Sequence, residues 1–85
     1  MFNVGDKVIL ISKLYMDTES NPLYGGKYGE CIGIVEKVDL CGPYIYQIEW
    51  PLLNTSNDYR ENDLELYSGY GYNKIFNDII EVIYR

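Results

Sequence analysis

Two strand-like runs joined by a short turn make up the stretch CIGIVEKVDLCGPYIYQIEW, from Cys31 to Trp50. The first run, Cys31–Val38, consists largely of small and β-branched residues. The second, Tyr44–Trp50, carries the tyrosines, isoleucines and tryptophan that suit a pleated surface. Between them Asp39–Pro43 supplies aspartate, glycine and proline, which favour a turn. The stretch therefore predicts an antiparallel hairpin.

Working outward from the hairpin, the chain predicts three further short strands. Upstream, Val8–Ile11 is a β-branched run that follows a Gly-Asp turn, and 14–28 is a long loop because it lacks periodicity and is rich in glycine. Downstream, Asp58–Arg60 is a short strand and Leu64–Tyr67 a closing strand. Glu61–Asp63, between these two, is expected to form a turn or a single 3₁₀ turn.

Four or five short strands with one long early loop indicate a mainly β protein, a small closed or nearly closed barrel. Eighty-five residues make a single domain. We assign the barrel to residues 1–67 and treat residues 68–85 as a C-terminal segment.

The C-terminal segment has a different periodicity. Its apolar residues recur at helical spacing and predict an amphipathic helix with Asn73 as N-cap. These residues are Ile75, Phe76, Ile79, Ile80 and Ile83. A sixth strand remains an alternative, because isoleucine and valine favour strands. The apolar face is expected to cover the barrel, to pack on a second subunit in a homo-oligomer, or to enter a partner's groove.

The order of the motifs resembles small Src-homology-3-like barrels, including KOW-type and other short bacterial or bacteriophage barrels. The matching stretches are VGDKVILI, GKYGECIGIVEKVD, YIYQIEW and NDLELY, and the resemblance covers residues 2–67. It implies a five-stranded barrel. Members of this group include nucleic-acid binders, peptide binders and accessory domains, so the resemblance alone does not assign a function. The chain lacks the Ala-Leu-Tyr-Asp-Tyr signature of proline-rich-peptide binders, and no binding residue is transferred from the family.

The charge balance is acidic, with a net charge of −6 and no histidine. Nucleic acids and anionic membranes are bound mainly through lysine and arginine, so neither is an expected partner. Without imidazole no histidine-based catalytic site is possible, and we expect no enzyme activity and no cofactor. The chain shows no signal peptide and no apolar run of membrane-spanning length, which predicts a cytoplasmic protein, in the host cytoplasm if it is phage-encoded.

Metal, disulfide and phosphate sites are not expected. The spacing of the carboxylates does not match a calcium loop. The hairpin would pair Cys31 with residues near 51 rather than with Cys41, so both cysteines should be free thiols. In NPLYGGKYGE, Asn21 to Glu30, the glycines lead into a strand rather than a helix, which favours a turn over a phosphate-binding loop.

Ten tyrosines in so short a chain suggest a contact surface, because tyrosine combines rigid apolar area with a polar tip. The alternative is that many of them cover a small core. We predict two sets of partner-contacting residues, the second of which would meet a basic partner surface. The tyrosines are Tyr24, Tyr28, Tyr44 and Tyr46, the last two on one strand face, and the acidic residues are Asp58, Glu61 and Asp63.

The sequence thus predicts a non-enzymatic protein-binding module that docks on, and modulates or inhibits, a larger protein. Its size, acidity and motif style are those of a bacteriophage accessory protein acting on a host protein. Three alternatives stay open: an inhibitor that mimics nucleic acid, a nucleic-acid-binding barrel that stacks bases on tyrosines, and a structural protein that self-assembles through its C-terminal segment.

Overall fold

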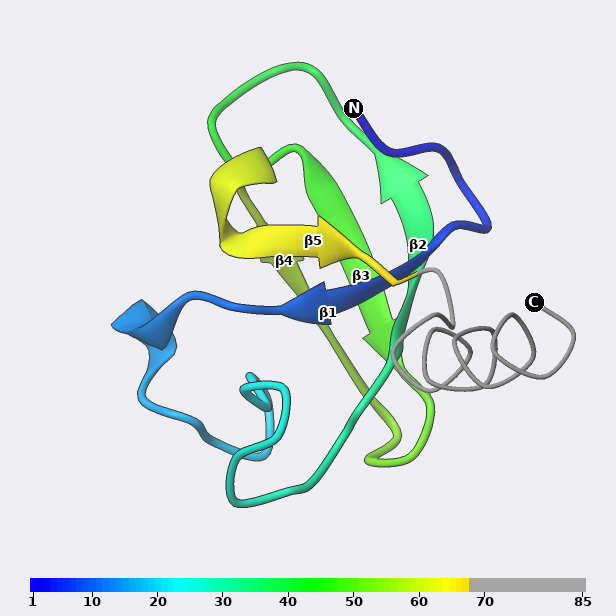
Figure 1. The fold of residues 1–85 in the computed structure, drawn as a ribbon. Coiled ribbons are helices and arrows are strands. Elements are labelled where there is room, and N and C mark those ends of the chain that lie inside the picture. Colours follow the sequence, from blue (N-terminus) through cyan, green and yellow to red (C-terminus); the bar gives the residue numbers. More distant parts are fainter. Residues whose placement is uncertain (68–85) are drawn as a thin grey trace, which may run out of the picture.

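The computed structural model describes residues 1–67, which form one antiparallel sheet of five strands (Figure 1). The strand order is β4-β3-β2-β1-β5. The strands are β1 (Lys7–Leu10), β2 (Gly33–Val38), β3 (Tyr46–Trp50), β4 (Thr55–Tyr59) and β5 (Leu64–Leu66). Two 3₁₀ turns complete the described part, η1 (Lys13–Tyr15) and η2 (Glu61–Asp63). The prediction of a mainly β protein is confirmed.

The predicted hairpin is formed by β2 and β3, which pair from Ile34 opposite Glu49 to Val38 opposite Tyr46. The register shifts between Val35 and Lys37, an irregularity that places an extra residue in β2. Both strands begin two residues later than the sequence predicts. At β3 the reason is local: the Asp39 N–H donates to the Ile45 carbonyl at 2.7 Å, and this bond closes the turn before β3 begins.

The sheet curls so that β1 and β5 lie over β3 and β4, and the core fills the space between these two pairs of strands (Figure 1). Figure 1 shows β1 and β5 crossing in front of β3 and β4. In β3 the period of two is clear, since Tyr46, Ile48 and Trp50 are fully buried while the residues between them are partly exposed. All five strands contribute to the core, which also includes Val8, Leu10, Cys31, Val35, Tyr59 and Leu64.

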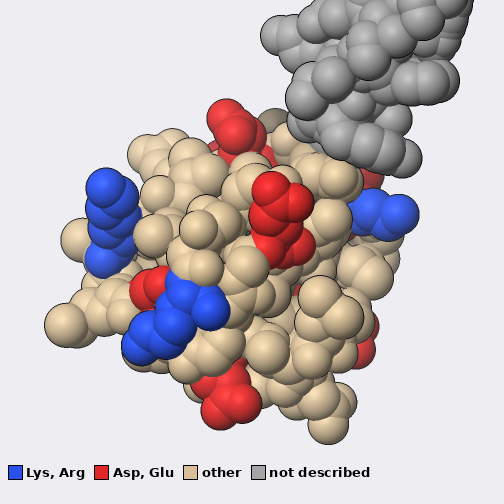
Figure 2. Space-filling model, turned by 60° about the horizontal axis from the view of Figure 1, so that its bottom comes forward, with Lys and Arg blue, Asp and Glu red and all other residues tan. Residues whose placement is uncertain are grey.

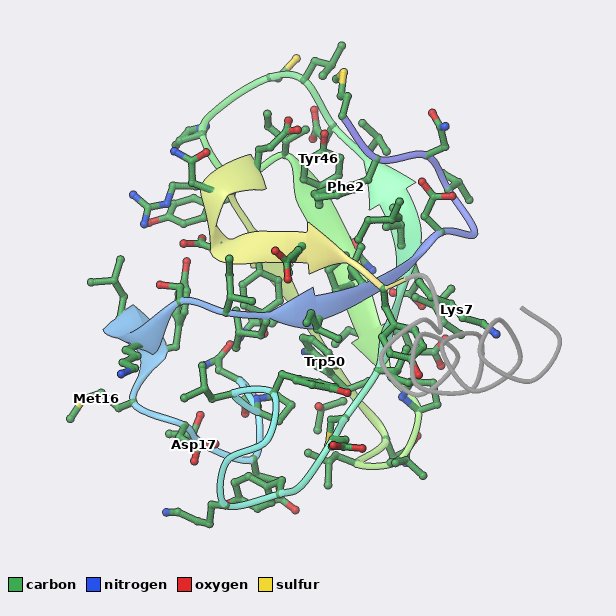
Figure 3. All side chains as sticks on the ribbon, viewed as in Figure 1. Phe2, Lys7, Met16, Asp17, Tyr46 and Trp50 are labelled. Carbon is green, nitrogen blue, oxygen red and sulfur yellow. The ribbon has the colours of Figure 1, made fainter. Side chains whose placement is uncertain are left out.

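The long loop between β1 and β2 is organised by one carboxylate. Met16 and Asp17 adopt left-handed conformations, with φ of 65° and 49°, and turn the chain back on itself (Figure 3). The Asp17 carboxylate accepts the N–H groups of Leu23 at 3.1 Å and Lys27 at 2.7 Å. The N–H groups of Gly25 and Gly26 donate to the carbonyls of Gly29 and Leu23 inside the loop. The glycine-rich stretch thus forms the turn that the sequence predicts.

A buried tyrosine ties this loop to the sheet. The Tyr59 hydroxyl accepts a hydrogen bond from Trp50 Nε1 at 3.0 Å and donates to Asn21 Oδ1 at 2.6 Å. Asn57 Nδ2 donates to the same Asn21 oxygen at 2.8 Å. Since Trp50 and Tyr59 are fully buried, these bonds fix the loop against β3 and β4.

The predictions for the C-terminal segment lie outside the described residues. They concern the helix with its N-cap at Asn73 and the apolar face of Ile75, Phe76, Ile79, Ile80 and Ile83. Within residues 1–67 no helix is long and apolar enough to cross a membrane.

Candidate functional site

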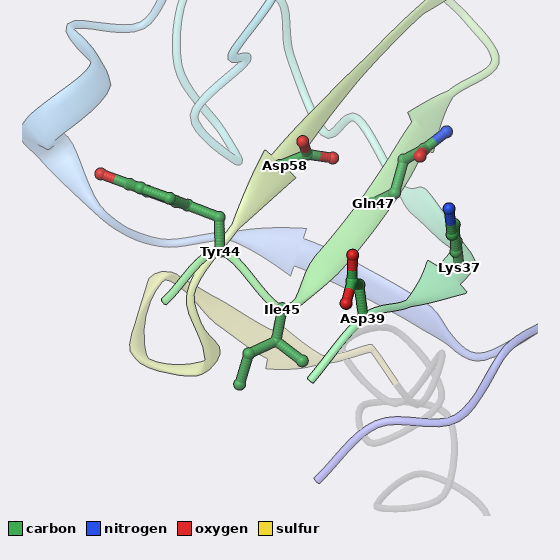
Figure 4. A pocket seen from close by; sticks show the side chains of 6 residues that line it. All are labelled: Lys37, Asp39, Tyr44, Ile45, Gln47 and Asp58. Atoms are coloured by element: carbon green, nitrogen blue, oxygen red, sulfur yellow. The ribbon is translucent and has the colours of Figure 1, made fainter. Parts of the chain in front are cut away.

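A shallow groove crosses the outer face of the sheet, at the end of β3 that carries Tyr46. Its volume is about 130 Å³. Strand pairing builds its floor, because Lys37 in β2 lies opposite Gln47 in β3, which lies opposite Asp58 in β4. Figure 4 shows these three side chains rising from neighbouring strands. The remaining lining residues come from the β2–β3 connection: Asp39, Tyr44 and Ile45.

The β2–β3 turn gives the groove its aromatic and aliphatic parts. Tyr44 follows Pro43, precedes β3 and is 53% exposed, so its ring stands at the surface. Ile45 is half-buried and packs against the core. The hydrogen bond between Asp39 and Ile45 holds the two sides of the turn together. One oxygen of the Asp39 carboxylate also accepts the Cys41 N–H at 3.0 Å, which orients that carboxylate.

The groove is negatively charged. Two carboxylates, Asp39 and Asp58, stand against one ammonium group, Lys37, which leaves one net negative charge. In the part of the chain that the structure describes, ion pairs join the Met1 ammonium to Glu61 and Arg60 to Asp63. Neither groove carboxylate forms an ion pair there.

The acidic character continues along the outer face of β2, β3 and β4. Glu36 accepts hydrogen bonds from Gln47 Nε2 at 2.8 Å and from the Ser56 hydroxyl at 3.3 Å, and Glu49 lies opposite Ser56. Lys37 is the sole basic residue in these three strands. On the face seen in Figure 2 the lysine and arginine side chains form no continuous patch. We call the outer face of β2, β3 and β4, together with the groove at its end, the acidic face. Its carboxylates are Glu36, Asp39, Glu49 and Asp58.

Two of the seven predicted contact residues meet at the groove, namely Tyr44 and Asp58. Tyr24 and Tyr28 lie in the long loop instead. Tyr24 donates its N–H to the Leu10 carbonyl at 3.0 Å and its ring lies 6.3 Å from that of Tyr67. Tyr28 packs against the core.

Tyr46 is buried, so the prediction that it contacts a partner is wrong. Its ring packs edge-on against Phe2 with centroids 5.1 Å apart (Figure 3). Its hydroxyl accepts the Phe2 N–H and donates to Glu61 at 3.0 Å. Burial raises the pKa of this hydroxyl, which stays protonated. Tyr44 and Tyr46 do not share a strand face, because Tyr44 precedes β3.

Asp63 is also buried, with 2% of its surface exposed, which contradicts its predicted role at a surface. Its carboxylate accepts hydrogen bonds from the Tyr15 hydroxyl at 2.5 Å and from the Arg60 side chain and N–H. Burial alone would raise the pKa of Asp63, but the hydrogen bonds from Arg60 and Tyr15 outweigh it and the pKa is lowered. Asp63 therefore anchors η1 to η2 rather than meeting a partner.

Glu61 is partly exposed but already engaged. One oxygen pairs with the Met1 ammonium group at 3.0 Å and the other accepts the Tyr46 hydroxyl. The bond from that ammonium group, followed by the bond from Tyr46, lowers the pKa of Glu61. The predicted acidic surface from Asp58 to Asp63 thus separates into one groove residue and two residues bound to the domain itself.

Sequence reasoning missed four groove residues: Lys37, Asp39, Ile45 and Gln47. One available signal was the period of two, which places Gln47 on the opposite face from buried Tyr46. The position of Lys37 carried no such signal. It depends on the register shift in β2, which alternation does not reveal.

The six residues that line the groove include no histidine, cysteine or serine. Among residues 1–67 no three His, Cys, Asp or Glu side chains are grouped to hold a metal ion. Cys31 is buried and Cys41 exposed, and both are free thiols, as predicted. Burial raises the pKa of Cys31, which disfavours the nucleophilic thiolate. The groove is lined by an aromatic ring, an aliphatic side chain and two carboxylates that form no ion pair within residues 1–67.

No protein-family model matches this chain, and neither a curated protein nor a solved structure shows significant similarity to it.

Proposed function

We propose that this protein is a non-enzymatic binding module that docks on a basic surface of a protein partner through its acidic face. The observation that carries the proposal is the groove, which Tyr44, Asp39 and Asp58 line together. An exposed tyrosine and exposed carboxylates are the features that a positively charged partner surface would complement.

The physical basis is pre-organisation. The groove floor belongs to β2, β3 and β4, whose opposite face is the packed core, so its side chains start from fixed backbone positions. Tyrosine adds a large contact area at a small cost in side-chain entropy. The surrounding carboxylates attract basic partners at long range and raise the rate of association at low salt.

The same proposal includes the finer fold and the biological setting. We propose that the curled sheet is a Src-homology-3-like barrel, supported by its strand order, its long first loop and the 3₁₀ turn before β5. A helix in residues 68–85 would complete the domain. A phage-encoded accessory protein that modulates or inhibits a host protein is the role we propose, on the resemblance of the motifs alone.

Affinity capture from a bacterial lysate tests this function. The tagged wild-type protein is compared with the double variant Tyr44→Ala/Asp58→Asn and with Glu30→Gln, which removes one exposed carboxylate outside the acidic face. We expect one protein that the wild type and Glu30→Gln retain, that the double variant loses, and that elutes as salt rises. Retention of the same protein by the double variant would contradict docking through the acidic face.

A further inference from the structure

We infer that the groove is an anchor site for a single arginine side chain presented by the partner. This inference rests on the proposed function and adds to it the chemical group that is recognised. It follows from three features of the groove: its size, its combination of side chains and the position of its one basic residue.

The volume of the groove suits one side chain. At about 130 Å³ it is well below the range of roughly 300–1,000 Å³ that is typical of sites for small organic ligands. A long side chain entering from a partner's surface fills such a depression, while the partner's backbone stays outside. The site is thus matched to an anchor residue rather than to a cofactor.

The lining chemistry favours a guanidinium group. A planar guanidinium stacks on an aromatic ring and bonds a carboxylate with two parallel N–H groups, and it is less strongly hydrated than an ammonium group. The groove supplies the ring of Tyr44 and the carboxylates of Asp58 and Asp39.

Lys37 sets the orientation of the anchor. It lies across Gln47 from Asp58, so an entering cation is attracted toward Asp58 and repelled from the side of β2. Figure 4 shows Tyr44 and Asp58 on the side of Gln47 away from Lys37. The guanidinium therefore belongs on the Asp58 side of Gln47, and Lys37 weakens its binding. Arg60, whose charge also acts on Tyr44, is paired with Asp63.

The two charges give opposite predictions for matched variants. Asp58→Asn should weaken binding of an arginine side chain by about three- to fivefold, within the range expected for a direct exposed charge pair. Lys37→Gln should strengthen binding by less, at most about twofold, because Lys37 lies two strand spacings from Asp58 and water screens its repulsion. Both substitutions are at exposed positions of the sheet. Asp58→Asn keeps the side-chain size, and Lys37→Gln shortens the side chain slightly. A general loss of folding would weaken binding in both variants and cannot produce this pattern.

The test is a titration of the ¹⁵N-labelled full chain followed by its amide NMR signals. The probe is a capped Gly-Ser-Arg-Ser-Gly peptide, and the control is the same peptide with citrulline, which has nearly the same shape as arginine but no charge. The titration runs through the millimolar range, because one anchor residue supports a Kd on the order of 1 mM. We expect the arginine peptide to shift the signals of Tyr44, Gln47 and Asp58, and the citrulline peptide to leave them in place.

Equal shifts with both peptides, no shift at the groove, or weaker binding in Lys37→Gln would overturn the arginine assignment. The peptide titration and the affinity capture can fail independently of each other. If the peptide fails while the captured protein is still lost in the Tyr44→Ala/Asp58→Asn variant, the acidic face docks a partner by another group. If the capture is insensitive to that variant, the proposed docking itself is wrong.

Discussion

At the scale of single residues, two buried oxygen-bearing groups hold the long loop against the sheet. The Tyr59 hydroxyl joins Trp50 to Asn21, and the Asp63 carboxylate joins Tyr15 to Arg60. Both groups are buried, and a buried polar atom that loses its partner costs more than the hydrogen bond itself contributes. Asp63, which the sequence predicts as a surface contact, is here part of the support of the loop.

Tyr59→Phe should lower the free energy of unfolding by roughly 1–2 kcal/mol, because Trp50 Nε1 and Asn21 Oδ1 lose a buried partner while the ring volume is kept. Urea unfolding measures the change. The matched control is Tyr28→Phe, another tyrosine that packs on the core but for whose hydroxyl residues 1–67 provide no hydrogen bond. Equal stability of the Tyr59 variant and the wild type would show that the hydroxyl does not anchor the loop.

Asp63→Asn should lower the free energy of unfolding by roughly 2 kcal/mol at neutral pH, since charge-assisted hydrogen bonds are lost. The folded pKa of Asp63 is lowered, so its contribution is complete above the unfolded value of about 3.9 and is lost as pH falls through the folded value. The gap between wild type and variant should therefore narrow below about pH 4. Urea unfolding across this range measures it, and a gap that widens on acidification would contradict the account.

At the scale of elements, the hairpin could be predicted and the start of β3 could not. Alternation in YIYQIEW places Tyr46, Ile48 and Trp50 on one face of β3, but it does not say which face is buried. The prediction that Tyr46 contacts a partner chose the wrong face, since all three residues are fully buried. Propensity also favours a strand at Tyr44 and Ile45, but the Asp39 to Ile45 hydrogen bond places them in the turn. This bond joins residues six apart along the chain, and the sequence did not reveal it. The same limit explains why Tyr44 is exposed and Tyr46 is not.

A substitution at Gly33 tests how closely β2 packs against the side chains of β3. A methyl group at this position would run into the side chains of Ile48 and Trp50. Gly33→Ala should therefore destabilise the domain by roughly 1–3 kcal/mol, the usual cost of overpacking. Thermal unfolding compares it with Lys37→Ala, an exposed position on the same strand. Similar melting temperatures for both variants would mean that the packing at Gly33 is loose.

At the scale of the whole molecule, function depends on which predicted residues the fold brings together. The sequence located Tyr44 and Asp58 but not the groove between them, because that groove needs the pairing of β3 with β4 and the register shift in β2. It overestimated the acidic run, since a charge in the sequence does not show whether the fold uses it internally, as Asp63 is used. The general acidity was predictable, and the meeting of Glu36, Glu49 and Asp58 on the outer face of β2, β3 and β4 was not.

The most direct test of docking through the acidic face uses the captured protein once purified. Its Kd is measured for the wild type, for Tyr44→Ala/Asp58→Asn and for the Glu30→Gln control, with circular dichroism to verify folding. We predict binding about 10- to 100-fold weaker for the double variant, the loss expected when a central anchor contact is removed, and unchanged binding for the control. Equal dissociation constants for the wild type and the double variant would contradict the account.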